Sequence, residues 1–198
     1  MNNFANILLS PQRLWSRFEI LSSDCPIPRR PGVYAWFFKD IPPGVPIEGC
    51  CTFDSLNLLY IGISPTAPPT NGAPSSRQTL RSRLQYHFRG NAEGSTLRLT
   101  LGCLLSKKLD IQLRRVGSGK RMTFTTLGEE KLSDWMAANA YVCWIEVDEP
   151  WKLEDQLIRT LPLPLNLRGN PNHAFHPTLS DIRRKAKIIA KQLPIVAR

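Results

Sequence analysis

The chain lacks any apolar run long enough to cross a membrane, because a spanning helix needs about 20 consecutive apolar residues and no such run occurs in the sequence. The first residues also lack the charged start and the small-residue cleavage site of a secretory signal. These two absences predict a soluble intracellular protein of the cytoplasm, with no membrane partner.

Cysteine and histidine are too few and too poorly spaced for a disulfide framework or a structural zinc site. The chain has five cysteines, an odd number, and no Cys-x-x-Cys pair. Cys143 lies in an apolar run, and we predict that it is a core residue. His173 and His176 have no neighbouring cysteine, so we interpret them as loop residues rather than metal ligands.

Acidic residues are scarce as well. The 16 Asp and Glu residues stand against 26 Lys and Arg, which gives a formal net charge of +10 at pH 7. Clustered Lys and Arg bind polyanions favourably because they release counterions from phosphates. The balance of charge favours a nucleic acid as the partner, with an anionic membrane surface as the alternative.

The sequence predicts one folded core. A chain of 198 residues with 42% hydrophobic content can bury a single core, and it shows no internal repeat. Aromatic and branched residues predict strands over residues 32–38, 57–63 and 141–147, and the first two are expected to be antiparallel neighbours. We therefore predict an α/β fold, more strictly α+β, with a small three-stranded, mainly antiparallel central sheet flanked by helices.

Apolar residues at helical spacing predict helices around these strands. Ser75 and Gln78 fit the first and fourth positions of a capping box, and Gly90 fits the end of the helix that follows. Glycines in the 117–119 segment predict the turn of a basic hairpin. The expected helices cover residues 11–21, 77–89, 95–107, 129–139, 150–160 and 179–192.

The order of these segments predicts three parts. Residues 1–30 form an N-terminal helical extension, and residues 31–170 form the main domain. Two stretches of that domain, 40–55 and 111–125, are expected to be surface insertions. Residues 171–198 form a basic helical tail.

Two tyrosines lie on the predicted strands. Side chains two apart on a strand share a face, so Tyr60 and Gly62 point the same way, and Tyr34 joins them if the strands pair in register. The missing side chain at Gly62 would let a phosphate approach the sheet. Aromatic residues in strands are usually core packing, so both interpretations stay open at this point.

Three polar residues on the predicted helices extend the pattern. Arg83 and His87 are four apart and share one helix face, where the arginine suits phosphate oxygens. A solvated, arginine-rich face is an equal alternative. Glu154 follows the start of the 150–160 helix, and a lone carboxylate suits one Mg²⁺ that also binds water and substrate oxygens. Its alternative is an ordinary first-turn glutamate.

Taken together, these segments resemble the GIY-YIG endonuclease family over roughly residues 31–166. The two motifs that name the family appear as Gly32-Val33-Tyr34 and Tyr60-Ile61-Gly62. The family's helix arginine, metal-binding glutamate and following asparagine match Arg83, Glu154 and Asn166.

Two further positions refine the resemblance. His87, four residues after the arginine, is similar to the restriction and intron-homing branches of the family. Ile63 stands where many relatives have a lysine directly after the second motif, so we expect another residue, His87, to help activate the nucleophile.

The resemblance implies a metal-dependent DNA endonuclease that hydrolyses phosphodiester bonds, with Mg²⁺ or Mn²⁺ as its cofactor. Tyr34 would take a proton from the attacking water, alone or with His87. Arg83 and Tyr60 would hold the scissile phosphate. Asn166 would orient Glu154 or the nearby backbone. The implied catalytic residues are Tyr34, Tyr60, Arg83, His87, Glu154 and Asn166, with Glu154 as the metal ligand.

A basic stretch predicts the surface that follows the nucleic acid backbone. Residues 77–121 contain eleven basic residues against two acidic ones. The basic closing helix is either a second grip on the substrate or a solvated face. The expected nucleic-acid-binding residues are Arg81, Arg89, Arg98, Arg114, Arg115, Lys120 and Arg121.

The substrate class stays open at this level. Double-stranded DNA, single-stranded DNA and RNA all suit the charge. A restriction-type enzyme that cuts a palindrome would need a homodimer or sequential nicking. The alternative to an enzyme is a catalytically inactive nucleic-acid-binding module with the same fold.

Overall fold

The structure is a computed structural model that describes residues 3–71, 73–74 and 76–197. Within these residues, four strands form one antiparallel sheet in the order β2-β3-β1-β6. The strands are β1 (Gly32–Phe38), β2 (Thr52–Phe53), β3 (Leu56–Ser64) and β6 (Ala140–Glu146). The predicted fold class is confirmed, but three strands was one too few. Strand β2 has two residues, too short to show an alternating pattern, and it lies in the expected insertion at 40–55.

Strand β1 is an inner strand of the sheet, paired along its length with β3 on one side and β6 on the other. All seven of its residues are buried, as expected for a strand covered on both faces. Tyr34, Trp36 and Phe38 pack into the core on one face. Val33, Ala35 and Phe37 pack into a second core on the other face. Because side chains alternate along β1, Tyr34 lies on the face of the sheet that α3 covers.

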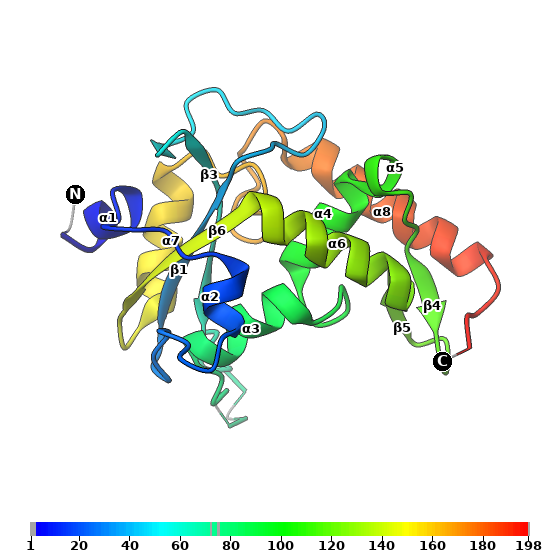
Figure 1. Cartoon of the computed structure of the whole chain (residues 1–198), viewed down its shortest axis with the longest axis horizontal. Coiled ribbons are helices and arrows are strands. Elements are labelled where there is room, and N and C mark those ends of the chain that lie inside the picture. The colour runs from blue at the N-terminus through cyan, green and yellow to red at the C-terminus, as the bar shows by residue number, and fades with distance from the viewer. Residues whose placement is uncertain (1–2, 72, 75, 198) are drawn as a thin grey trace.

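The sheet lies between two layers of helices (Figure 1). Helices α1 and α7 pack on one face, and α2, α3 and α6 pack on the other, with α4 beyond them. The bounds are α1 (Asn3–Leu9), α2 (Arg17–Leu21), α3 (Leu80–Arg89), α4 (Thr96–Leu104), α6 (Thr125–Asn139) and α7 (Pro150–Thr160). No helix in the described part of the chain is both long enough and apolar enough to cross a bilayer.

The C-terminal helix α8 (His176–Gln192) is packed against the body of the protein. Its Leu179 and Ala190 are fully buried, and it contacts α4 and β4. The predicted hairpin is present as β4 (Arg114–Val116) and β5 (Arg121–Thr123), next to the short helix α5 (Ser106–Leu109). The chain then returns to this hairpin, where Val196 bridges to Val116. Figure 1 shows α8 beyond α4, away from α1 and α7.

Several predicted helix starts were wrong. Helix α2 begins at Arg17, because Ser16 caps it in a capping box with Glu19, and Trp15 instead pairs with β6. Helix α3 begins at Leu80 rather than 77, because Thr79 forms the capping box with Ser82. The cap predicted at Ser75 lies outside the described residues. The predicted 95–107 helix is divided at Leu105 into α4 and α5.

Irregular chain covers the β6 edge of the sheet and the part of β3 that extends past the short β2. At the β6 edge, Trp15 and Val142 exchange backbone hydrogen bonds of 2.9 and 3.0 Å. At the β3 edge, the Leu165 N–H donates to the Leu59 carbonyl at 3.1 Å, and the Asn166 side chain bonds to the backbone of Ile61. These contacts satisfy backbone groups that an edge strand would expose. The second contact also brings the loop after α7 to the two tyrosines.

Candidate active site

The two tyrosine motifs meet across strands β1 and β3. Tyr34 pairs with Gly62, and Trp36 pairs with Tyr60, which confirms the expected antiparallel register. A Cβ atom built on Gly62 would lie 2.6 Å from the Tyr34 hydroxyl oxygen and 2.7 Å from its ring carbon Cζ. The space above Gly62 is therefore filled by the phenol of Tyr34. The missing side chain at Gly62 makes room for the Tyr34 ring, and this ring, not a phosphate, fills the space that the sequence analysis expected to be open.

Tyr34, His87 and Ser95 form a buried hydrogen-bonded chain. The Tyr34 Oη lies 2.9 Å from His87 Nε2, and His87 Nδ1 lies 2.7 Å from Ser95 Oγ. His87 and Ser95 are fully buried, and Tyr34 is 1% exposed. Ser95 also caps α4 by accepting the backbone N–H of Arg98 at 3.1 Å. The imidazole is thus fixed at both nitrogens.

Burial sets the protonation of this chain. Desolvation raises the pKa of Tyr34 well above its ordinary value, the nearby Tyr60 raises it further, and the Arg83 guanidinium opposes the shift. Desolvation also lowers the pKa of His87 well below its usual range, with Arg83 and Arg98 acting in the same direction. At neutral pH the site therefore holds a phenol and a neutral imidazole.

Arg83 and Tyr60 complete the polar wall beside Tyr34. The Arg83 Nε donates to the Tyr34 hydroxyl at 3.4 Å, and its Nη1 donates to the Gly94 carbonyl at 2.9 Å. The guanidinium stays charged whatever its surroundings. Burial raises the pKa of Tyr60, so this residue also presents a phenol, and the Thr96 hydroxyl and Arg83 partly offset the shift.

These side chains line a cavity of about 630 Å³. Glu154 reaches it from α7, the helix on the opposite face of the sheet, at the point where β3 has no long neighbouring strand. Burial raises the pKa of Glu154 to about 7, with Arg168 lowering it and Asp155 raising it. The polar and charged side chains around the cavity come from Tyr34, Tyr60, Thr66, Arg83, Thr96, Thr100, Glu154, Asp155, Asn166, Arg168 and Arg183.

The oxygen ligands near Glu154 fit a hard cation that would take most of its other ligands from the phosphate of a substrate and from water. No three His, Cys, Asp or Glu side chains gather into a metal-binding group among the described residues. The half-buried Glu154 carboxylate, in a cavity with room for phosphate oxygens and water, suits Mg²⁺, which keeps several waters and takes one or two carboxylates. A cation beside Glu154 would stabilise the ionised carboxylate and so oppose the burial that raises its pKa.

Asn166 is brought to the cavity but is not directed at Glu154. Its Nδ2 donates to the Ile61 carbonyl at 2.7 Å, and its Oδ1 accepts the Ile61 N–H at 2.9 Å. Ile61 lies between Tyr60 and Gly62. Of the two roles predicted for Asn166, the contacts agree with the orientation of backbone and not with the orientation of Glu154.

Ile63 occupies the position where many relatives have a lysine, and it brings no polar group to the site. Its side chain is 8% exposed and packs into the core beneath α7. The His87 imidazole, with its Nε2 2.9 Å from the Tyr34 hydroxyl, is therefore the group that the lysine's absence leaves beside Tyr34 together with Arg83.

Arg98 is not on the expected nucleic-acid surface, and that prediction was wrong. Its side chain is fully buried and forms an ion pair with Glu129, Nη2 to Oε2, at 2.7 Å. The same guanidinium donates to the His87 carbonyl at 3.2 Å and to the Ser133 hydroxyl at 3.1 Å. A buried guanidinium bonded in this way cannot reach a phosphate.

The other basic residues predicted to bind nucleic acid fall into two groups. Arg81, Arg114 and Arg115 are half-buried and donate to the backbone carbonyls of Cys25, Pro194 and Leu193 at 3.1, 2.9 and 3.0 Å. Three others are exposed: Arg89, Lys120 and Arg121.

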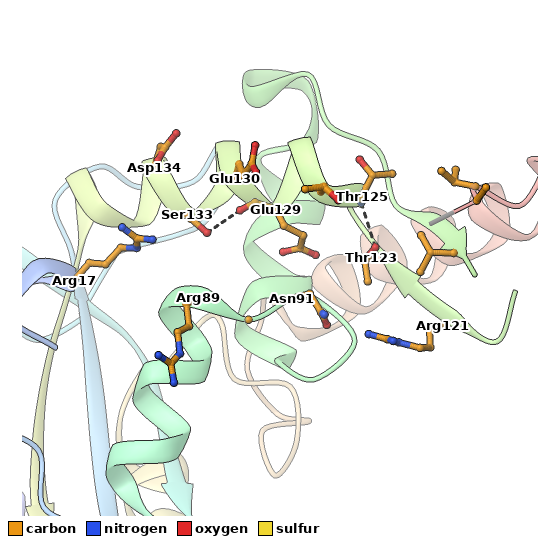
Figure 2. A pocket seen from close by; sticks show the side chains of 15 residues that line it. Arg17, Arg89, Asn91, Arg121, Thr123, Thr125, Glu129, Glu130, Ser133 and Asp134 are labelled. Carbon is orange, nitrogen blue, oxygen red and sulfur yellow. Dashed lines mark hydrogen bonds between the residues drawn. The ribbon is translucent and has the colours of Figure 1, made fainter. Parts of the chain in front are cut away.

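Arg89 and Arg121 line a second cavity of about 530 Å³, shown in Figure 2. Arg17 also lines this cavity, and three carboxylates of α6 line it too: Glu129, Glu130 and Asp134; of these, Figure 2 shows Glu129 pointing toward the side of Arg89 and Arg121. Charges of both signs line this cavity.

Sequence reasoning missed three groups that the fold brings to the site. Ser95 was recognisable only as a helix start, although the N-cap serine is what holds His87. Thr96 and Arg183 reach the cavity from α4 and α8, which are far apart in the sequence. The arginine carried one signal, its place in a basic helix, and this signal did not distinguish it from its neighbours.

Of the comparisons with known proteins, the one with family models gave a match. No curated protein and no solved structure matches the chain significantly. The family model described as the GIY-YIG catalytic domain matches residues 32–185, which is more than half of the chain. The match begins at the first residue of β1 and ends within α8, so it contains every residue of the cavity wall described above. The chain therefore belongs to the GIY-YIG family.

Proposed function

We propose that this protein is a metal-dependent endonuclease that hydrolyses phosphodiester bonds in DNA. Membership of the GIY-YIG family supports a nuclease function in general, with nucleic acid as the substrate. One observation carries the specific proposal. The Tyr34 hydroxyl contacts both His87 and Arg83 at the wall of the cavity that Tyr60 and Glu154 also line.

Tyr34 and His87 share the role of general base in this proposal. A phenol whose pKa is raised by burial cannot be a ready-made phenolate, so it needs a partner to take its proton. If His87 donates Nδ1–H to Ser95, its Nε2 accepts the Tyr34 O–H. Tyr34 then takes a proton from the attacking water as it passes its own proton to His87.

Arg83 and Tyr60 hold the scissile phosphate. The guanidinium and the phenol O–H are donors on the same cavity wall, and donors held in place before reaction stabilise the charge that develops on phosphate oxygens. Arg83 is anchored by the Gly94 carbonyl, which fixes its direction.

Glu154 would hold one Mg²⁺ or Mn²⁺. When bound, such an ion supplies Lewis-acid stabilisation of negative charge on the phosphate and on the departing 3′ oxygen. The protein's own contribution is a single carboxylate in a partly desolvated position, whose proton must leave before it can bind a cation.

The test is a cleavage assay on labelled DNA with Mg²⁺, comparing the native chain with Glu154→Ala. We expect the variant to lose cleavage and to keep its fold and DNA affinity. Glu149→Ala, at the exposed N-terminus of the same helix, is the matched control and should cleave normally. If Glu154→Ala keeps full activity with Mg²⁺, the metal assignment is wrong. If the native chain binds DNA in a salt-sensitive way but does not cleave it in the presence of any divalent metal, the chain is an inactive binding module.

The subtype is tested with the same enzyme on plasmid, linear duplex, single-stranded DNA and RNA. Discrete bands from the plasmid would support a restriction-type enzyme, and its size in solution would then distinguish a homodimer from a monomer that nicks sequentially. Loss of only the single-stranded substrate would support structure- or strand-directed cutting. Cleavage confined to RNA would contradict DNA as the substrate.

A further inference from the structure

The C-terminal helix α8 contributes a side chain to the active-site cavity. Arg183 lines the cavity together with Tyr34, Arg83 and Glu154, although α8 lies at the other end of the sequence from the tyrosine motifs. Its position is fixed from two directions. Leu179 and Ala190 anchor the helix in the core, and the Arg183 Nη1 lies 3.4 Å from the Thr100 hydroxyl of α4.

Arg183 is set apart from its neighbours on the same helix. Arg184 and Lys185 both pair with Asp181. Among the described residues, no carboxylate lies within ion-pair distance of Arg183. Burial lowers the pKa of Arg183, while the nearby Cys103 and Tyr60 act in the opposite direction. An arginine stays ionised under such conditions, so its charge enters the cavity without a protein counterion.

Positive charge thus reaches the cavity from two different helices, in addition to the exposed Arg168 in the loop after α7. Arg83 extends from α3 beside Tyr34, and Arg183 extends from α8. A nucleic acid strand carries one phosphate per nucleotide, so the phosphate that Arg83 holds always has charged neighbours. A second desolvated guanidinium in the same cavity matches such a neighbour, and phosphate contacts of this kind set the register of the substrate.

We propose that Arg183 is a substrate-positioning residue that binds a phosphate next to the scissile one, which makes α8 part of the substrate site rather than a solvated face. This inference rests on the proposed function, because it requires a phosphodiester substrate. The role differs from that of Arg83, which contacts the catalytic tyrosine itself.

The test compares Arg183→Ala with Arg184→Ala, its matched control one position further along the helix. A fluorescein-labelled oligonucleotide, titrated in EDTA at several salt concentrations, reports affinity, and Mg²⁺-dependent cleavage of the same oligonucleotide reports KM and kcat. For Arg183→Ala we expect affinity to fall about 10-fold and KM to rise by a similar factor. The slope of log affinity against log salt concentration should become shallower by about one, the value for one lost phosphate contact. Arg184→Ala should match the native chain in all three, and Arg183→Lys should recover part of the affinity.

A second measurement identifies the contact. Once the cleaved bond is mapped, single methylphosphonates at the adjacent positions remove one phosphate charge at a time. If Arg183 binds one of these phosphates, the effects of Arg183→Ala and of that methylphosphonate will be non-additive, and the other positions will be additive.

The failures of the two proposals are distinguishable. Normal cleavage by the native chain, together with native affinity and salt slope for Arg183→Ala, overturns the role of Arg183 and leaves the nuclease proposal intact. Additive effects at every methylphosphonate position overturn it as well. Absence of both cleavage and binding in the native chain overturns the proposed function, and with it the premise of this inference. A melting temperature for Arg183→Ala measured beside that of Arg184→Ala identifies a loss due to unfolding.

Discussion

Two polar regions meet at His87, and they differ in how completely their hydrogen bonds are satisfied. Behind the imidazole, the Arg98 guanidinium is enclosed by Glu129, Ser133 and the His87 carbonyl. In front of it, Tyr34 and Arg83 face a cavity and retain capacity for a further partner. The first region stabilises the fold because its donors are matched inside the protein. The second lines a cavity, so its side chains can accept a further partner there, and Arg83 and Arg98 differ in what surrounds them although they are only 15 positions apart in the sequence.

We call the buried hydrogen bonds around Arg98 the enclosed region, and the cavity side with Tyr34 and Arg83 the open region. The largest expected effect comes from removing the ion pair of the enclosed region. Arg98→Met leaves the Glu129 carboxylate without its buried partner, so the free energy of unfolding should fall by about 3–5 kcal/mol. Urea denaturation followed by circular dichroism measures this.

Arg83→Met is the matched change in the open region, and it should remove cleavage while costing less than about 1 kcal/mol of stability. A stable Arg98→Met chain with weakened DNA binding would contradict the comparison and restore Arg98 to the nucleic-acid surface.

Gly62→Ala tests how tightly the cavity side of His87 is packed around Tyr34, the tyrosine of the proposed mechanism. A methyl group 2.6 Å from the Tyr34 hydroxyl forces the ring out of its hydrogen bond with His87. Overpacking of this kind costs about 1–3 kcal/mol, and a reacting group displaced by about 1 Å loses roughly 100-fold in rate. Single-turnover cleavage measures the rate, with DNA affinity as the control for a folded surface. Cleavage at the native rate would show that Tyr34 does not depend on this space.

Glu154 and His87 give the open region a pH dependence of two signs. The folded-state pKa of Glu154 is raised to about 7 from its ordinary 4.5, so the folded chain holds an extra proton between these values, and Glu154 makes stability fall as pH rises through that window. His87 acts oppositely, because its pKa is lowered and its contribution is lost as pH falls below its ordinary 6.5. Melting temperatures of the native chain and Glu154→Gln from pH 4.5 to 8 separate the two.

The difference between these two curves isolates Glu154. Glu154→Gln should be more stable than the native chain near pH 8, by on the order of 1 kcal/mol after allowance for its partial exposure. The two chains should converge near pH 4.5. Cleavage should be absent in Glu154→Gln at every pH. Parallel melting curves would mean that the carboxyl is not desolvated in the folded chain.

Ser95→Ala gives the smallest expected effect, because it removes one hydroxyl shared by both regions. The hydroxyl caps α4 and contacts His87 Nδ1, so stability should fall by about 1 kcal/mol, and kcat should fall about 10-fold with KM unchanged. Ser16→Ala removes a similar cap at α2, far from the site, and should cost stability without changing kcat. Ser95→Thr keeps a hydroxyl and should recover part of the rate. Equal kcat values in the two alanine variants would reduce Ser95 to a helix cap.

The strands and their motifs could be predicted because the pattern that identifies them is local. Gly32 to Phe38 is a continuous apolar run, and its register with β3 follows from side chains that alternate between two cores. The purpose of an individual arginine could not be read in the same way. Arg98 meets Glu129, which is 31 positions away, and only the packing of α4 against α6 reveals the pair.

The helix boundaries show a second limit. The sequence rule for a capping box asks for Glu or Gln at the fourth position, which Gln78 supplies after Ser75, whereas α3 is capped by Thr79 with Ser82 at that position, a pair that the rule does not name. Arg183 and Thr96 were missed because α4 and α8 approach the cavity through tertiary packing.

Asn166 serves as a one-residue strand. Its amide offers the Ile61 backbone the same donor and acceptor that a neighbouring peptide group would supply. Without it, this stretch of β3 would present an unpaired amide and carbonyl in a buried, β-rich sequence, the arrangement that recruits a strand from another molecule. Replacement of Asn166 would therefore open this part of β3 to pairing with another molecule, so we expect it to promote aggregation.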